Sequence, residues 1–553
     1  MNRRDFLSFS SVSETSSAPM MPTRSLAGDL TPYSGPWDRA AAAHLLRRCC
    51  FGPTPEEINQ ALNWGLEQTL DRLLGNHQLP APPVMFDFNE DRNAREGQTW
   101  IEAPLDDGGD DGRRRRSLRA WNIGLMVGEG IRIRESMVLF WHNHFSVEIG
   151  KVGEARNAYQ YLDLLRKNAL GNFKTLVEEM TILPAMLRYL DGDDNRKGRP
   201  NENYARELFE LFSIGKGPLR GPGDYTYYNE NDVLAAAECL TGWRPITQGD
   251  DAGSPQVEFS EDRHEPGDKQ FSAAFQNRVI SNAGKDEYKV LIDMIFAEKQ
   301  TAVHIVKKLY RWFVYYDITE EVMRDIIEPL AQQMVDENYE VKNVIRRLLA
   351  SEHFLGTDSH GAYIKHPLDM VVGVVKNSRY PVPTETDYIW SYYFWDNMLN
   401  QARNMQMEFM NPPDVAGWKA FYQEPLFHQI WINSVTLPYR FSYLKNFVRN
   451  GYRKNDIRIE MDLIELLGTV EDPFDPNLLI SGWTERFLPM PLDQVQLDAL
   501  KNVLIPGLPD FEWTEEYMLY LADPSDEMVS KSILTKLEAL LTAIVTMAEF
   551  QLS

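Results

Sequence analysis

Apolar residues recur every three or four positions along most of the chain, which is the spacing of one buried face of an α-helix. The pattern runs through residues 118–145, 158–190 and 201–215, and it returns at 301–316 and 340–355. We therefore predict helices packed around a common core in these ranges.

Strand-like alternation is scarce, and residues 245–285 look irregular, with room for a short hairpin. The sequence thus predicts a mostly α fold: a large multi-helix globular domain with long irregular loops and at most a small hairpin. A helix start is marked clearly by Thr54, Pro55 and Glu57, which suit a cap, a first turn and a capping box.

Composition divides the chain into three predicted parts. Residues 1–35 are rich in Ser, Thr and Pro and are typical of a disordered tail. Residues 36–450 form the predicted main helical domain, in which the charged segment 88–117 is expected to be a loop insertion. Residues 451–553, which include a Pro- and Asp-rich segment at 469–513 before the final helices, are expected to form a C-terminal helical subdomain packed on the main domain.

The N-terminus resembles a degenerate twin-arginine export signal. "MNRRDFLSFS" has the arginine pair, but "SVSETSSAPMMP" follows where such a signal needs an apolar segment. The chain therefore either carries a degenerate signal, travels with an exported partner, or stays inside. A periplasmic or extracellular location is expected, with a cytoplasmic one left open. The sequence contains no run of about eighteen apolar residues, so we expect no transmembrane helix.

Charge argues against one class of partner. The chain has 57 basic and 81 acidic residues, a formal net charge of −24, which would repel a nucleic-acid backbone. The basic run Arg113–Arg116 follows four aspartates, so local neutralisation is expected. Hydrophobic residues at 43% and charged residues at 25% are typical of a globular protein with a large core.

Two histidines, His142 and His144, lie in the apolar stretch "FWHNHFSVEIGK". Residues two apart on a helix point about 200° apart, so both could face one metal ion only if the helix broke near Asn143. Three readings remain: core histidines satisfied by hydrogen bonds, metal ligands, or a general base.

The stretch "YLDGDDNRKGRPNENYARELFELF" has the ligand spacing of a calcium loop. The candidate oxygen ligands are Asp191, Asp193, Asn195 and Glu202. Arg196 stands where such loops need glycine, so a turn followed by a capped helix is the alternative. In that case Glu202 and Arg206 would form part of an ion ladder, and burial of Glu202, Arg206 and Glu207 would instead mark a site.

A third group of candidates lies in "TGWRP" and "HEPGDKQF", where we single out Trp243, Arg244, His264 and Lys269. His264 is a candidate catalytic residue because loops carry function on a rigid scaffold. Trp418 in "NPPDVAGW" is a candidate ligand contact, since two prolines and a glycine make that turn rigid.

Several of these segments together resemble an uncharacterised bacterial family, domain of unknown function 1800: "HLLRRCCFGPTPEEI", "RESMVLFWHNHFSV", "LRKNALGNFKTLVEEMTILPAMLRYLD", "PNENYARELFELFSIG", "LTGWR", "HEPGDKQF" and "NPPDVAGW". The resemblance covers about residues 38–450 and reaches the closing "AEFQLS". It implies a largely helical, usually exported protein, often encoded beside a sulfatase-like family, domain of unknown function 1501. It implies no reaction and no catalytic residues.

Two functions are therefore expected as alternatives. In the first, the protein binds a ligand or partner protein through a polar cavity lined by His142, His144, Glu202, Arg206, Glu207 and His264. In the second, a His/Glu site holds a divalent cation such as calcium and performs hydrolysis. The standard hydrolase, kinase and dehydrogenase signatures are missing from the sequence.

Overall fold

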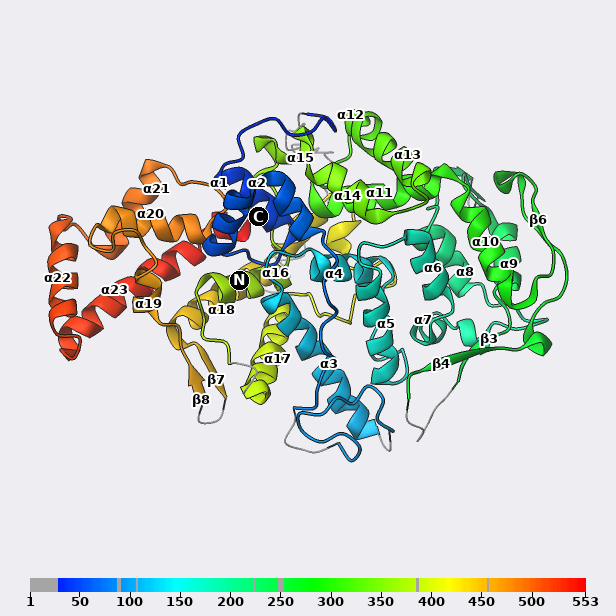
Figure 1. Cartoon of the computed structure of the whole chain (residues 1–553), viewed down its shortest axis with the longest axis horizontal. Coiled ribbons are helices and arrows are strands. Elements are labelled where there is room, and N and C mark those ends of the chain that lie inside the picture. The colour runs from blue at the N-terminus through cyan, green and yellow to red at the C-terminus, as the bar shows by residue number, and fades with distance from the viewer. Residues whose placement is uncertain are drawn as a thin grey trace, which may run out of the picture.

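A computed structural model describes residues 28–86, 91–105, 108–221, 224–246, 253–383, 387–454 and 457–553. The predicted mostly α fold is confirmed. Figure 1 shows helices crossing one another throughout, with the C-terminal helices at one end and the hairpins β3–β4 and β5–β6 near the other.

The helices of the first half surround the segments that carry most of the candidate residues. They are α1 (Arg39–Cys49), α2 (Pro55–Leu73), α3 (Gly108–Gly128), α4 (Arg134–His144), α5 (Ala155–Lys167), α6 (Phe173–Thr181), α7 (Pro184–Tyr189), α8 (Asn203–Glu207), α9 (Glu230–Cys239) and α10 (Glu287–Phe296). The start of α2 matches the prediction, because Thr54 and Glu57 form a reciprocal capping box.

The second half continues the helical pattern. Its helices are α11 (Lys299–Phe313), α12 (Glu320–Val322), α13 (Glu328–Asp336), α14 (Val341–Leu349), α15 (Glu352–Leu355), α16 (Pro367–Asn377), α17 (Tyr388–Asn404), α18 (Thr436–Asn450), α19 (Leu463–Leu467), α20 (Pro476–Phe487), α21 (Gln494–Leu504), α22 (Phe511–Ala522) and α23 (Glu527–Val545). Within the C-terminal region α23 packs against α20, α21 and α22, and it also contacts α18.

Strands are short and pair only as antiparallel hairpins in the part of the chain that the structure describes. The pairs are β1 (Leu219–Gly221) with β2 (Asp224–Tyr225), β3 (Trp243–Ile246) with β4 (Gln256–Phe259), β5 (Lys269–Gln270) with β6 (Val279–Ile280), and β7 (Tyr452–Lys454) with β8 (Ile457–Ile459). We expected at most one hairpin, near 245–285; two of these pairs involve that region.

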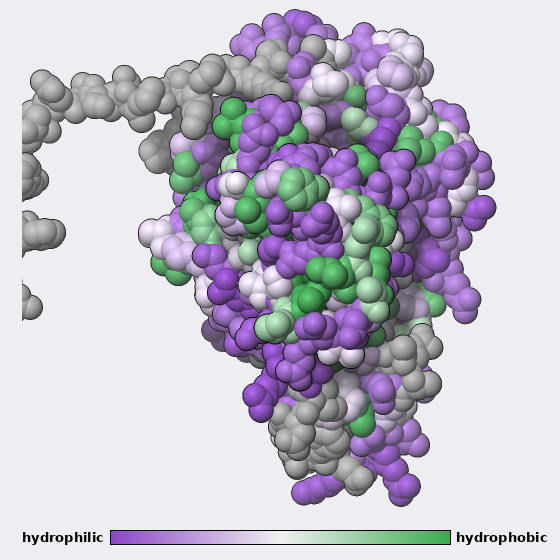
Figure 2. Space-filling view, turned by 90° about the vertical axis from the view of Figure 1, so that its left-hand side faces the viewer, coloured by the Kyte–Doolittle hydropathy of each residue, from purple (hydrophilic) through white to green (hydrophobic). Residues whose placement is uncertain are grey.

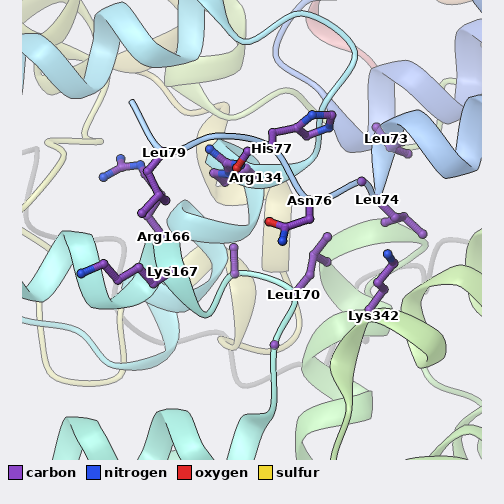
Figure 3. Close-up of a pocket in the computed structure, with 13 residues that line it drawn as sticks. Leu73, Leu74, Asn76, His77, Leu79, Arg134, Arg166, Lys167, Leu170 and Lys342 are labelled. Atoms are coloured by element: carbon purple, nitrogen blue, oxygen red, sulfur yellow. The ribbon is translucent and has the colours of Figure 1, made fainter. Parts of the chain in front are cut away.

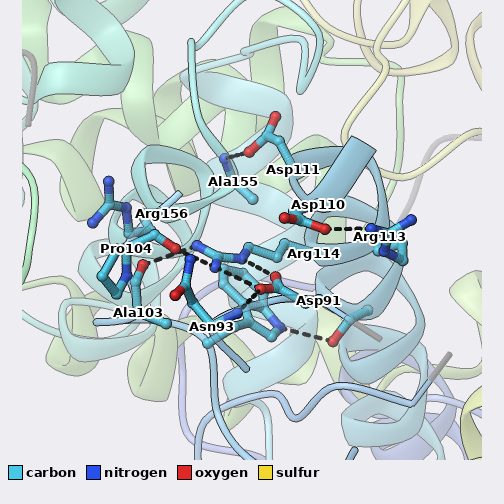
Figure 4. Close-up of polar contacts among 12 residues, drawn as sticks. Asp91, Asn93, Ala103, Pro104, Asp110, Asp111, Arg113, Arg114, Ala155 and Arg156 are labelled. Carbon is cyan, nitrogen blue, oxygen red and sulfur yellow. Dashed lines mark hydrogen bonds and ion pairs between the residues drawn. The ribbon is translucent and has the colours of Figure 1, made fainter. Parts of the chain in front are cut away.

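The charged segment 88–117 is not a loop throughout, which corrects the prediction for its last ten residues. Residues 108–117 are the first turns of α3. The expected local neutralisation is observed for Arg113 and Arg115, which pair with Asp110 and Asp111. The partners of the other two arginines are more distant in the sequence: Arg114 Nε lies 2.5 Å from Asp91 (Figure 4), and Arg116 lies 2.7 Å from Asp396. Paired arginines can occupy a partly buried helix that their charge alone would exclude.

The start of α3 is tied to the start of α5 by one carboxylate. Asp111 accepts a hydrogen bond of 2.6 Å from the Ala155 amide (Figure 4). It also forms an ion pair of 2.5 Å with Arg115. An acceptor at a helix N-terminus satisfies an amide that has no partner within its own helix. Aspartate and arginine therefore fix the angle at which these two helices meet.

Residues 28–35 were predicted to belong to a disordered tail, but they are ordered against the folded body. Residues 1–27, with the arginine pair, lie outside the described residues. The Tyr33 amide donates to the Ala350 carbonyl at 2.8 Å, and Ser34 donates to Glu352. Residues from about 28 onward therefore belong to the folded body beside α15.

Candidate functional site

A cavity of about 540 Å³ lies where the C-terminal half of α3 meets α17 and the segment 78–82. Gly124 makes this meeting possible, because a Cβ there would lie 2.7 Å from the Trp395 ring. The cavity is lined by Gln78, Pro80, Ala81, Pro82, Trp121, Gly124, Leu125, Gly128, Glu129, Arg132, Arg134, Glu135, Pro383, Tyr388, Ser391, Tyr392 and Trp395. We call it the aromatic cavity; its volume falls within the range of about 300–1,000 Å³ usual for small-molecule sites.

Hydrogen bonds fix the aromatic walls. Trp121 Nε1 donates to the Ala81 carbonyl at 3.1 Å, and the Tyr392 hydroxyl accepts from the Val84 amide at 3.0 Å. The Tyr388 hydroxyl donates to Glu96 at 3.0 Å. These three rings are thus held at their polar ends, so their faces are preorganised for contact with a ligand; Trp395 Nε1, by contrast, has no hydrogen-bond partner among the described residues.

Glu129 supplies an incompletely paired carboxyl group to this cavity. Its Oε1 accepts from the Glu135 amide at 2.8 Å, whereas Oε2 has no hydrogen-bond partner among the described residues. Burial, and then the charge of Glu135, raise the pKa of Glu129 well above its ordinary value. A carboxyl group with a raised pKa retains its proton to higher pH, and the protonated form can donate a hydrogen bond.

Glu135 is neutralised by a second buried group. Arg166 binds it through two hydrogen bonds of 2.7 Å and also donates to Asn122 at 2.8 Å. The same guanidinium lies 4.9 Å from the Trp121 ring centroid. This bidentate pair fixes Trp121 and Glu135 together, which makes it the structural support of the cavity wall.

The predicted site around His142 is a packed core instead. His142 Nε2 accepts from the Met410 amide at 3.2 Å, and Nδ1 lies 2.9 Å from the Tyr161 hydroxyl. Burial lowers the pKa of His142 to about 3. Trp418, predicted separately, packs edge-on against this imidazole at 5.5 Å between centroids. Both nitrogens are occupied, which favours the core reading over a metal ligand or a base.

His144 faces a different set of groups, as expected for residues two apart on α4. Its Nε2 lies 3.2 Å from the Phe212 carbonyl, and Lys308 donates to Nδ1 at 3.0 Å. Leu208–Phe212 is a π-helical turn, whose carbonyls are displaced from regular helical pairing. Lys308 and His304, both half-buried, bind the Leu211 carbonyl, so this turn is held by these two side chains and the buried His144.

The calcium-loop reading does not fit the observed geometry. Asp191 adopts φ 55° and accepts from the Asn203 side chain, while Asn195 is buried and bonds to Ala237 and the Asn201 amide. Glu202 pairs with Arg206 at 2.9 Å. No group of three or more His, Cys, Asp or Glu side chains in the described ranges is arranged to hold a metal ion. The turn-and-cap alternative describes this segment.

The acidic helix α8 is largely at the surface. The Glu202 side chain is 39% exposed, and Arg206 also binds Glu230 at 2.7 Å. Glu207 is half-buried, and desolvation followed by Glu210 raises its pKa to about 7. The two imidazoles are fully buried, so the shared hollow that we predicted for these residues does not form.

His264 and Lys269 do come together, through a residue that the sequence did not reveal. Both contact Glu287, at 3.2 Å and 2.5 Å, and all three are buried. Trp243 packs against Phe259 and Tyr288, and Arg244 is exposed beside Glu258. Trp243, His264 and Lys269 therefore tie the hairpins β3–β4 and β5–β6 to α10, whereas Arg244 pairs within its own hairpin. None of the four lines the aromatic cavity.

Sequence reasoning missed the aromatic cavity altogether. Its one local signal is the glycine-rich end of a helix, "GLMVGEG", in which Gly124 and Gly128 share a face next to Trp121 and Glu129. Glycines at helical spacing allow the close approach of another element. Nothing nearby indicates that this element is α17, more than 250 residues later.

Comparison with known families matches the DUF1800 family model, described as protein of unknown function, to residues 44–552. The chain belongs to the DUF1800 family. No curated protein and no solved structure matches it. Among the described residues of this DUF1800 chain, no helix combines the length and the apolar character needed to cross a membrane.

Proposed function

We propose that this DUF1800 protein binds a small polyhydroxylated molecule with an apolar ring face, such as a sugar, in the aromatic cavity. The observation that carries the proposal is the buried Glu129 Oε2, which lacks a partner beside preorganised aromatic walls. A buried polar atom without a partner is costly by about 1–3 kcal/mol, and a ligand hydroxyl would remove that cost.

Charge decides against a cationic ligand. Glu135 is neutralised by Arg166, and the raised pKa of Glu129 favours its uncharged form. Arg132 and Arg134 then leave the cavity with a positive surplus. Aromatic cages for amines need the opposite sign. A neutral or anionic ligand that stacks on Trp and Tyr and exchanges hydrogen bonds with Glu129 fits best.

Calorimetric titration with glucose, cellobiose, N-acetylglucosamine and glucuronate tests this proposal, with choline as the cationic control. We expect at least one sugar to bind with a Kd of about 1 mM or tighter, and Trp395→Ala to weaken it by about tenfold or more. Trp395→Phe should recover most of the affinity because it retains an aromatic face. Trp64→Ala removes a tryptophan outside this cavity and should change nothing.

Two results would overturn the proposal. One is the absence of binding heat for every sugar at millimolar protein-ligand concentrations. The other is choline binding more tightly than all of the sugars, which would mean that the cavity recognises cations. Thermal unfolding of each variant separates loss of binding from loss of folding.

A second candidate function, partner binding, is favoured by the surface of α22. Several large apolar side chains of α22 and the start of α23 are exposed: Phe511 (55% exposed), Met518, Leu519 (60%), Leu521 and Met528 (81%). Figure 2 shows apolar residues among hydrophilic ones on this end of the molecule. Large apolar side chains exposed together often mark a protein interface. The acidic residues Glu512, Glu515, Asp523, Asp526 and Glu527 adjoin them in the sequence, and we call these residues the acidic rim.

The acidic rim and the net charge of −24 disfavour a second copy of this chain as the occupant. We propose instead a protein with an apolar surface and a basic rim, and the resemblance suggests the sulfatase-like DUF1501 family. Purified DUF1501 protein should bind the full chain, and Phe511→Glu/Leu519→Glu should weaken binding by about tenfold or more. Val435→Glu changes an exposed valine on another face and is the control. This partner is rejected if purified DUF1501 protein does not bind the chain. It is also rejected if the wild-type chain self-associates and the double variant does not.

We do not propose a metal-dependent hydrolase, because three of the four predicted oxygen ligands, Asp191, Asn195 and Glu202, are bound to other protein groups. Export also stays a proposal. It rests on the "RRDFL" motif and the resemblance alone, and fractionation of cells producing the full chain would test it.

A further inference from the structure

A second cavity, of about 420 Å³, lies on the other side of the segment 75–79 from α17's aromatic rings. It is formed by the end of α2, the start of α4, the end of α5 and the start of α14 (Figure 3). Its lining residues are Leu73, Leu74, Gly75, Asn76, His77, Leu79, Arg134, Arg166, Lys167, Ala169, Leu170, Gly171 and Lys342. We call it the basic cavity.

The charge of its wall has one sign. Arg134, Arg166, Lys167 and Lys342 are among its lining residues, and no Asp or Glu is. In Figure 3 the Arg166 and Lys167 side chains extend to the left, away from Leu170 and Lys342. The whole chain has a formal net charge of −24, so this concave region is positive although the molecule as a whole is negative. A cleft lined by one sign of charge concentrates counter-ions of the opposite sign.

The local ion pairs leave part of this charge uncompensated. Arg166 is neutralised by Glu135, and Lys167 lies 2.7 Å from Asp163. Arg134 donates only to main-chain carbonyls of His77 and Gln78. Lys342 makes no ion pair with any residue that the structure describes. Two positive charges therefore remain for a ligand, which suits an anion of one or two charges.

The rest of the wall is aliphatic and adds a second requirement. Leu73, Leu74, Leu79 and Leu170 contribute to it, and Leu79 is exposed. A bare inorganic anion would bury no apolar surface against these leucines. Each CH₂ group that a ligand buried there would strengthen its binding by about fourfold.

We propose that the basic cavity is a binding site for a small amphipathic oxyanion, either a phosphate monoester or a carboxylate that carries a short aliphatic chain. Arg134 and Lys342 bind the anionic head, and the leucines contact the chain. This site shares Arg134 with the aromatic cavity, but the proposal does not depend on sugar binding there.

Calorimetric titration at low ionic strength with hexyl phosphate, hexanoate, hexanol and inorganic phosphate tests it. We expect at least one of the two amphipathic anions to bind, hexanol not to bind, and inorganic phosphate to bind more weakly. Tighter binding of hexyl phosphate than of hexanoate identifies a site for a dianion. Tighter binding of hexanoate identifies a site for a carboxylate. Added salt should weaken binding, because a half-open site is screened.

Lys342→Gln should weaken binding of the preferred anion by about three- to tenfold, which is the range expected for the loss of one partly exposed ion pair. Lys342 is exposed, so this variant should fold normally. Lys285→Gln removes one exposed lysine elsewhere and should leave the affinity unchanged. Leu79→Ser should weaken hexyl phosphate or hexanoate without affecting inorganic phosphate.

The proposal is overturned if neither amphipathic anion binds, if hexanol binds as well as the anions, or if Lys342→Gln and Lys285→Gln have equal effects. Sugar titration of the same Lys342→Gln protein should be normal. That measurement distinguishes failure of this proposal from failure of the aromatic cavity.

Discussion

The core around α4 and the aromatic cavity differ in how their polar groups are satisfied. His142 and His144 are surrounded by aromatic rings, and each of their nitrogens has a partner. Among the residues that line the aromatic cavity, Glu129 Oε2 and Trp395 Nε1 have no partner among the described residues. Unsatisfied polar atoms beside open space are therefore a better guide to a site than residue type.

The largest effect is expected in the core. His142→Ala should lower the free energy of unfolding by about 3 kcal/mol, because it leaves a cavity and removes the partners of the Met410 amide and the Tyr161 hydroxyl. Urea unfolding followed by circular dichroism measures this loss. His77→Ala, at a half-buried loop histidine, is the control. A stability within about 0.5 kcal/mol of wild type would reject a structural role for His142.

The corresponding change at the cavity is Gly124→Ala. Its methyl group would meet the Trp395 ring, so we expect a loss of about 1–3 kcal/mol from overpacking, together with loss of sugar binding. Gly128→Ala is the matched control, since a Cβ there meets nothing within 4 Å. Equal binding by both alanine variants would show that the α3–α17 contact does not shape the site.

Lys308 allows the core to be examined by pH. Burial, then Arg311, lower its pKa to about 7, against an unfolded value of about 10.4. Between these values the unfolded state binds more protons, so wild type should gain stability over Lys308→Met as pH rises from 7 to 10. The gain is at most about 1.4 kcal/mol per pH unit. A pH-independent difference between the two proteins would mean that Lys308 is not buried uncharged.

Glu129 should respond in the opposite sense. Its raised folded pKa means that the folded state binds more protons, so its contribution is fully present below the unfolded value near 4.3 and is lost as pH rises through the folded pKa. Sugar affinity should also fall as Glu129 ionises. In Glu129→Gln, which keeps a neutral donor and acceptor, affinity should stay within a fewfold of wild type and lose this pH dependence. Unchanged pH dependence in the glutamine variant would assign the effect to another group.

The smallest effect is expected at the predicted calcium loop. Glu202→Ala removes one exposed ion pair with Arg206 and should change stability by about 0.5 kcal/mol or less. Added calcium should not raise the melting temperature of either protein. Calcium stabilisation of wild type that disappears in Glu202→Ala would restore the metal-site reading.

Much of the fold could be predicted from sequence because helical periodicity and caps are local signals. The capping box at Thr54 and the apolar faces of α4 and α5 both needed only neighbouring residues. The charged start of α3 was missed because Arg114 and Arg116 are neutralised by Asp91 and Asp396, and the latter is far along the chain.

The candidate site could not be predicted in the same way. Glu129 and Glu135 look like ordinary surface charges in "GEGIRIRES", and their burial depends on Arg166 and on α17. Asp191–Glu202 have the sequence spacing of calcium-loop ligands, but the backbone directs the Asn195 side chain inward and the Glu202 side chain outward. Linear spacing does not determine on which side of the backbone a side chain lies.

Arg134 belongs to the walls of both cavities, and its hydrogen bonds to His77 and Gln78 hold the strip of chain that divides them. A ligand that moves this guanidinium toward one cavity removes it from the other and weakens its hydrogen bonds to the segment between them. Such antagonism is necessarily mutual: whatever factor the first occupant imposes on the second, the second imposes on the first. One side chain thus gives the two chambers a means of communication.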